Sequence, residues 1–210
     1  HQRELRYTGM GTQRAQQELE AFFPDARILR MDTDTTMAKD SHERKLAQFA
    51  QGEYDIMLGT QMVAKGLDFP NVTLVGVLSA DQSLYSDDFR SYERTFSLLT
   101  QVVGRSGRGT QAGKAVIQTF TPENPVIRMA AAQDYGAFYQ SEIVMRKAML
   151  YPPFADLCVL GFVGAQEEKT ARASQSFFQR LRELAQTRYS GIPLRVLGPS
   201  SASIAKVSNK

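Results

Sequence analysis

Helix-like and strand-like segments alternate over roughly the first 120 residues, and this alternation limits the possible folds more than any other feature. Helices are predicted over residues 12–23, 41–52 and 91–104, and short apolar strands over residues 27–31, 54–60, 72–80 and 113–120. Such an order typically places helices on both faces of a parallel sheet. The sequence therefore predicts an α/β fold with one open, mostly parallel sheet.

The pattern changes after residue 122. Residues 125–149 read as helical, Pro152 and Pro153 then break the chain, and a long helix over 167–188 lies between predicted strands at 156–163 and 194–197. Cys158, within an apolar run, is expected to be buried. We predict three parts: a parallel-sheet lobe over 1–122, a helical connector over 123–153, and a smaller, partial α+β domain over 154–210.

Composition excludes several classes of protein. The 210 residues carry a formal net charge of +3, which permits nucleic-acid binding without requiring it. The single cysteine excludes an internal disulfide framework and fits a reducing compartment such as the cytosol. The two histidines have no His or Cys at ligand spacing, so no metal site is expected. No apolar run is long enough to span a bilayer.

The segment "GTQMVAKGLDFP" begins where a predicted strand ends, at an edge of the sheet where ligands commonly bind. Thr60 could hold a phosphate through its hydroxyl and neighbouring amides. Gly66 permits a tight backbone, and Asp68 could accept hydrogen bonds from a ribose hydroxyl. The same residues also fit a plain structural connection, so the segment by itself leaves both interpretations open.

A second segment, "QVVGRSGRG", closes the predicted helix over 91–104. Arg105 and Arg108 are three residues apart, and arginine spreads its charge over several phosphate oxygens. Small glycines flank them, and Gln101 lies one helical turn earlier. The pattern suits an arginine finger that stabilises a transferring phosphoryl group. A basic surface patch or a glycine-rich turn is the alternative.

In this order and about 40 residues apart, the two segments resemble motifs V and VI of superfamily 2 helicases. The flanking stretches "GTQRAQQELEAFFPDARILRMDTDTT" and "RKAMLYPPFADL" resemble the bacterial replication-restart (primosomal) helicases, and the similarity covers nearly the whole chain. The resemblance implies a RecA-like lobe, the second motor lobe of a P-loop NTPase helicase, followed by part of a C-terminal domain.

The resemblance also implies a role for each motif residue. The motif VI residues would face the nucleotide: Gln101, with Arg105 and Arg108 as catalytic residues and Arg108 as the best candidate for the finger. In motif V, Asp68 would contact the ribose beside Gly66. The DNA backbone would be contacted by Thr60 and Gln61, together with Lys65.

The implied activity is ATP- and Mg²⁺-dependent 3′-to-5′ unwinding of DNA at stalled or abandoned replication forks. Implied partners are forked and single-stranded DNA, single-stranded-DNA-binding protein and primosome proteins, in the bacterial cytoplasm near the nucleoid and not at a membrane. Zinc is expected in the full protein, but this chain lacks the cysteine pairs to bind it.

The chain has neither a G-x-x-x-x-G-K-[ST] phosphate loop nor a DEAH tetrad. The segment most similar to a phosphate loop is "GKA" at residues 113–115. We therefore expect a piece of a longer protein that does not hydrolyse ATP by itself. Two alternatives stay open: a non-catalytic module that binds DNA phosphates, or another superfamily 2 remodelling motor. Asp68 and Gln101 favour a nucleotide site, because DNA phosphates require neither residue.

Overall fold

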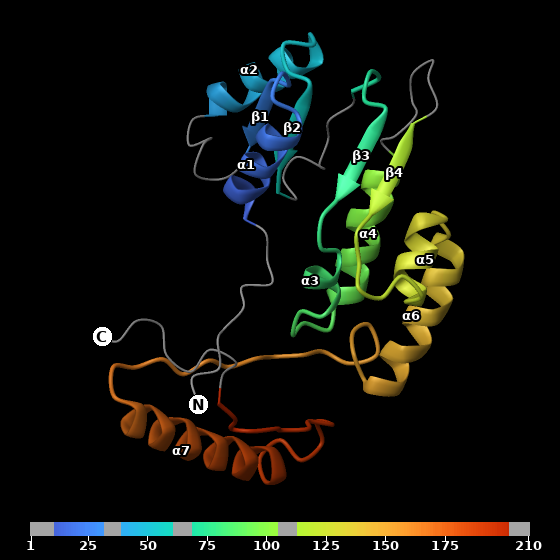
Figure 1. Cartoon of the computed structure of the whole chain (residues 1–210). Coiled ribbons are helices and arrows are strands. Elements are labelled where there is room, and N and C mark those ends of the chain that lie inside the picture. Colours follow the sequence, from blue (N-terminus) through green and yellow to red (C-terminus); the bar gives the residue numbers. More distant parts are fainter. Residues whose placement is uncertain (1–10, 32–38, 61–68, 105–112, 202–210) are drawn as a thin grey trace, which may run out of the picture. The chain divides into compact units, whose positions relative to one another are not determined.

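The computed structural model describes residues 11–31, 39–60, 69–104 and 113–201. The chain divides between Ala155 and Asp156 into two units, which are described separately below. Figure 1 gives the order of the helices and strands along the chain.

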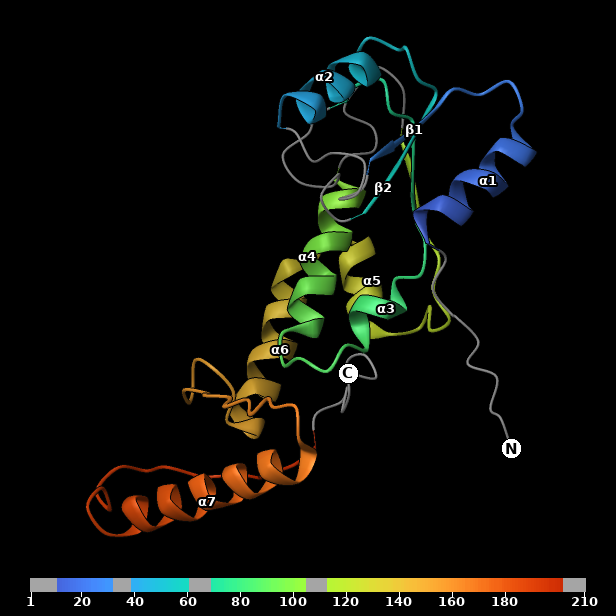
Figure 2. The ribbon, with the colours of Figure 1, turned by 90° about the vertical axis from the view of Figure 1, so that its left-hand side faces the viewer.

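In the first unit, strand β1 (Ile28–Met31) pairs in parallel with β2 (Ile56–Gly59), and Ile28 lies opposite Ile56. Helix α2 (Lys39–Ala50) is the crossover between them, while α1 (Thr12–Phe22) precedes β1. Figure 2 shows α1 and α2 on opposite sides of this strand pair. The two parallel strands therefore have a helix on each face, as the alternating sequence predicts.

A bidentate ion pair fixes the amino-terminal end of β1 and β2. The Arg27 guanidinium donates to both carboxylate oxygens of Asp55, at 2.9 and 3.0 Å, and also to the Gly52 carbonyl at 2.8 Å. The Arg27 backbone N–H donates to the same carboxylate at 2.9 Å. These bonds join the residues immediately before the two strands, so they help set the strand register.

Strands β3 (Leu74–Val77) and β4 (Lys114–Ile117) form a second parallel pair, with Leu74 opposite Lys114. The short helix α3 (Asp81–Leu84) and then α4 (Ser91–Val103) follow β3. Helix α4 contacts both strands as well as α5 (Pro125–Ala131) and α6 (Tyr135–Met149). It therefore lies between the strand pair and the α5–α6 hairpin.

The core of this part forms around α4. Leu99 is fully buried, and the Phe96 ring stacks on Phe138 of α6 with centroids 4.1 Å apart. The buried members of the cluster come from α3, α4, α5 and α6 and their flanks: Ala80, Leu84, Phe96, Leu99, Val126, Ile127, Ala130 and Phe138. The helical connector thus shares one core with α4, whereas the predicted domain limits themselves stay predictions.

Several helix limits differ from the sequence expectation. Helix α1 ends at Phe22, one residue before the predicted limit, and α2 begins at Lys39, before Ser41. Gly52 ends α2 as expected, with a positive φ of 78° that suits glycine. The helical stretch 125–149 is two helices, because the chain turns at Gln133 with φ 55°.

The prediction of one continuous sheet is wrong for the described residues, which contain two separate two-stranded parallel sheets. Each four-residue strand pairs with a single neighbour there, and no described ladder joins β2 to β3. Parallel pairing, the other half of the prediction, is confirmed. The described residues thus fit an α/β helicase lobe in pairing and in helix order, but not in the extent of the sheet.

The second unit contains one described helix, α7 (Glu167–Gln186), close to the predicted span. The predicted strands over 156–163 and 194–197 are wrong, because neither segment takes part in a ladder among the described residues. Cys158 is exposed, not buried, and Val163 is fully exposed. The smaller α+β domain is therefore not confirmed.

The Arg27–Asp55 pair makes a testable prediction about titration. Hydrogen bonds from Arg27 lower the pKa of Asp55 from 3.8 to about 2. The pair should therefore stabilise the fold fully above pH 3.8, and this contribution should be lost as the pH falls through about 2. Carboxyl-carbon NMR titration measures the midpoint directly, and Arg27→Met should return it close to 3.8. A midpoint of 3.8 with Arg27 present would contradict the pairing.

Candidate functional site

Two of the eight sequence-predicted site residues lie in the described parts of the chain. Thr60 directly follows the last residue of β2 and is exposed. Gln101 lies in the last turn of α4 and is also exposed, whereas its neighbour Val102 is buried. Both residues therefore have the surface accessibility that a ligand contact requires.

The other six predicted site residues lie outside the described residues: Gln61, Lys65, Gly66, Asp68, Arg105 and Arg108. Their roles stay predictions from sequence. The described chain leads directly to them in sequence. Strand β2 ends at Gly59, two residues before Gln61, and α4 ends at Val103, two residues before Arg105.

The carboxyl edge of β3 and β4 carries a polar cluster centred on Asp81. Its carboxylate accepts hydrogen bonds from the Thr119 hydroxyl at 2.9 Å, the Phe120 backbone N–H at 3.0 Å and the Thr121 hydroxyl at 3.2 Å. Burial would raise the pKa of Asp81, but these hydrogen bonds lower it below its ordinary value, so the group stays charged. The cluster ties the start of α3 to the chain leaving β4.

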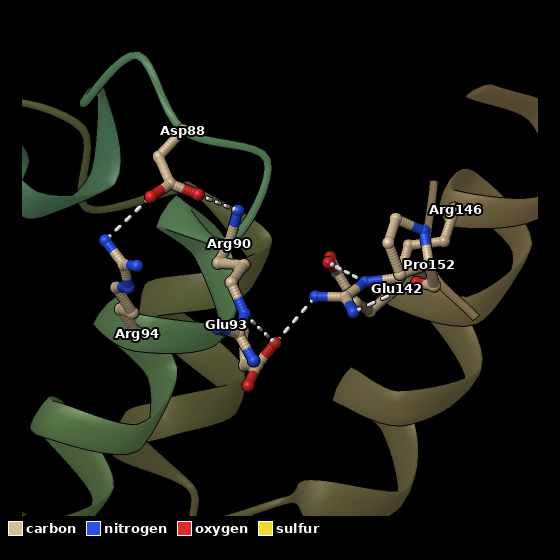
Figure 3. A network of polar contacts seen from close by, with 7 residues as sticks. All are labelled: Asp88, Arg90, Glu93, Arg94, Glu142, Arg146 and Pro152. Atoms are coloured by element: carbon tan, nitrogen blue, oxygen red, sulfur yellow. Dashed lines mark hydrogen bonds and ion pairs between the residues drawn. The ribbon is translucent and has the colours of Figure 1, made fainter. Parts of the chain in front are cut away.

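A second polar network connects the start of α4 to the end of α6 (Figure 3). The Arg146 guanidinium donates to Glu93 at 2.7 Å, to Glu142 at 2.8 Å and to the Pro152 carbonyl at 3.3 Å. The guanidinium also lies 5.6 Å from the centre of the Phe89 ring. A cation in this position holds two carboxylates from two different helices.

The electrostatics of Arg146 follow from its burial and partners. Its side chain is only 13% exposed, and that of Glu142 is 9% exposed. Burial would lower the pKa of Arg146, but the bonds to Glu142 and Glu93 raise it above its ordinary value. The guanidinium therefore stays charged, and the network anchors the amino-terminal end of the helix that carries Gln101.

Comparison with known proteins shows which family this chain resembles. Residues 9–110 match the model of the helicase conserved C-terminal domain. The chain is 46% identical over 206 residues to replication restart protein PriA of Bacillus subtilis, covering 98% of this chain. It is 40% identical over 206 residues to PriA of Synechocystis and 36% identical over 199 residues to PriA of Haemophilus influenzae.

The chain belongs to the PriA family. Identity at this level along almost the whole chain confirms the resemblance inferred from motifs V and VI. The chain covers about a quarter of the length of these PriA relatives: 25% for B. subtilis, 24% for Synechocystis and 27% for H. influenzae. The similarity to the PriA relatives thus extends beyond the helicase C-terminal domain match, which ends at residue 110, over the part of this chain that contains α5 to α7.

The sequence alone did not single out Asp81, Glu93 or Arg146. A signal was present for the last of these, because Glu142 and Arg146 are four residues apart on one helix, a spacing that favours ion pairs. The partner Glu93 is 53 residues away in sequence, so only the fold identifies it.

Two negative observations apply to the described residues only. No described helix combines the length and the apolar character that a membrane-spanning segment needs. In the same ranges, no three His, Cys, Asp or Glu side chains gather closely enough to hold a metal ion.

Removing the buried cation should destabilise this part of the protein. Arg146→Met keeps most of the side-chain bulk but leaves Glu142 and Glu93 without their shared cation. Breaking a buried pair in this way costs about 3 kcal/mol, near the lower end of the usual range because Glu93 is partly exposed. Urea unfolding of the protein, followed by circular dichroism, measures the loss.

The matched control for this variant is Arg14→Met. Arg14 forms an ion pair with Glu18, four residues away, and is 74% exposed, so its removal should hardly move the unfolding midpoint. Equal midpoints for the two variants would show that the Arg146 network does not stabilise the α4–α6 contact.

Proposed function

We propose that this chain forms the second motor lobe of an ATP-dependent DNA helicase that acts in replication restart. The observation that carries the proposal is the exposed Gln101 in the last turn of α4, four residues before Arg105, in a chain of the PriA family. A glutamine followed by two arginines is the motif VI pattern, and α4 would present it from a rigid helix end.

The nucleotide side of the proposed site is half of an ATP site. Gln101, Arg105 and Arg108 would contact the phosphates, with Gly66 and Asp68 beside the ribose. Because this sequence has no phosphate loop, the other lobe of the motor would hold Mg²⁺ and most of the phosphate contacts. Hydrolysis of the bound ATP to ADP and phosphate would supply the free energy for strand separation. The exposed end of α4 is compatible with this arrangement.

The role of the arginines follows from the chemistry of phosphoryl transfer. Charge accumulates on the phosphoryl oxygens in the transition state, and a guanidinium offers several N–H donors in a fixed plane. Arg108 would stabilise that charge, and Arg105 would support it. Gln101, which is neutral, would contribute a hydrogen bond without competing for the charge.

The DNA side of the proposed site begins at Thr60. Thr60 is an exposed residue directly after β2, and Gln61 and Lys65 follow it in sequence. Contacts from such residues to backbone phosphate give affinity without reading the base sequence. We propose that the full protein binds forked and single-stranded DNA, moves 3′ to 5′ and works with single-stranded-DNA-binding and primosome proteins in the bacterial cytoplasm. Zinc would belong to parts of the full protein other than these residues.

The first test of this proposal is Arg108→Ala in the full-length protein. ATP turnover stimulated by single-stranded DNA should fall by about 10³-fold or more, as for other arginine fingers. DNA affinity should stay nearly unchanged, and Arg108→Lys should recover little turnover because a point charge cannot replace the planar fork. Steady-state ATPase assays and fluorescence anisotropy measure the two quantities.

Arg14→Ala, at an exposed arginine of α1, is the control for a general loss of positive charge. The isolated 210 residues, which lack a phosphate loop, should hydrolyse no ATP above background. If Arg108→Ala weakened DNA binding and left turnover normal, the chain would instead be a module that binds DNA phosphates.

The second test separates the DNA side from the nucleotide side. Thr60→Val removes one hydroxyl and should weaken binding to every DNA sequence by about 0.5–1.5 kcal/mol. Asp68→Asn should raise KM for ATP and leave DNA affinity without nucleotide intact. Anisotropy and ATPase titrations on both variants of the full-length protein check this. The opposite result, with Thr60→Val changing only the ATP response and Asp68→Asn only the DNA affinity, would reverse the assignment.

A further inference from the structure

The turn between α5 and α6 lies against the carboxyl-terminal end of α4. Gln133, in this turn, donates a hydrogen bond from Nε2 to the Thr100 carbonyl at 3.5 Å. A Cβ placed on Gly104 would lie 3.1 Å from the same Nε2 atom. Gly104 immediately precedes Arg105, so the amide of Gln133 covers the last described residue before the arginine segment.

The conformation of the turn is unusual for the residue it contains. Gln133 has a φ of 55°, a left-handed conformation that side chains other than glycine, asparagine and aspartate rarely adopt. Backbone bonds hold the turn, because Gln133 N–H donates to the Ala130 carbonyl and Asp134 N–H to the Met129 carbonyl. A strained backbone held by its surroundings is a reason to look for a function at that residue.

The rest of α4 is already fixed to the same hairpin. The Arg146 network holds its first turn through Glu93, and the Phe96–Phe138 stack holds its middle. Carbonyls in the last turn of a helix often have no N–H partner within the helix. The Thr100 carbonyl accepts a hydrogen bond from the Gly104 N–H at 2.9 Å, and it accepts the Gln133 amide as a second donor. The Gln133 amide is thus a third point of attachment, at the end that leads to the arginines.

We propose that Gln133 is a positioning residue for the motif VI arginines. Gln133 positions them by donating a hydrogen bond to the Thr100 carbonyl and by packing its amide over Gly104. Gly104 has no side chain that would displace the amide. A neutral donor suits this place, since it satisfies a carbonyl at the negative end of the α4 dipole without adding a charge beside the phosphates. The inference rests on the proposed function, because it assumes that Arg105 and Arg108 act on ATP.

The test uses four variants of the full-length protein. Gln133→Ala removes the amide, and Gln133→Glu keeps its shape but cannot donate to the Thr100 carbonyl. Gly104→Ala pushes the amide away with a methyl group, and the fourth variant combines Gly104→Ala with Gln133→Ala. Gln140→Ala, at an exposed glutamine of α6, is the control.

We expect kcat for DNA-stimulated ATP hydrolysis to fall about tenfold in each single variant, because small displacements of catalytic groups are costly. KM for ATP and DNA affinity should stay within about twofold of the unchanged protein, and the thermal midpoint should not move. The double variant should be no worse than Gln133→Ala, since both substitutions break the same contact. Gln140→Ala should leave every quantity unchanged.

Three results would overturn the inference: normal kcat in Gln133→Ala, a loss of thermal stability that accounts for the loss of kcat, or losses that multiply in the double variant. Arg108→Ala, measured in parallel, separates this inference from the proposed function. Normal turnover in Arg108→Ala refutes the proposed function and the inference with it. Impaired turnover in Arg108→Ala together with normal turnover in Gln133→Ala refutes the inference alone.

Discussion

Helix α4 has to pack against two layers at once, and the arrangement of the residues around it follows from this. One side contacts the parallel pair β3–β4, and another contacts the α5–α6 hairpin. Leu99 is fully buried between them, while Gln101, two residues later, is exposed. Burial along the helix leaves one side of its last turn accessible, and that side carries the first residue of motif VI.

The α5–α6 hairpin also makes polar contacts with α4, and these contacts do not involve the residues proposed to bind ATP. Arg146 is a buried cation with two carboxylate partners, and losing it would leave Glu142 without its cation and Glu93 with only the longer contact to Arg90, at 3.9 Å. Its bond to Glu93 fixes the start of α4, whereas Gln133 contacts the end of the same helix. Residues beyond the helicase C-terminal domain match, which ends at residue 110, therefore contact both ends of the helix that precedes Arg105.

The sequence predicted the elements whose periodicity is strong. The limits of α4 and α7 are nearly right, because apolar residues recur at helical spacing over several turns. The strand over 156–163 is wrong, because an apolar run specifies burial only where a partner strand exists. The Gln133 turn could not be predicted, since its left-handed residue is not glycine. Thr60 and Gln101 lie near element ends, as predicted, and the structure shows that both are exposed, whereas the roles of all eight site residues stay predictions.

The most direct test of the account is a structure of the full-length protein bound to single-stranded DNA, ADP and aluminium fluoride, a mimic of the transferring phosphoryl group. The account predicts that the Arg108 guanidinium lies within hydrogen-bonding distance of the fluoride, about 3 Å, with Gln101 beside the nucleotide. An Arg108 side chain on the DNA backbone, with no motif VI residue near the nucleotide, would contradict it.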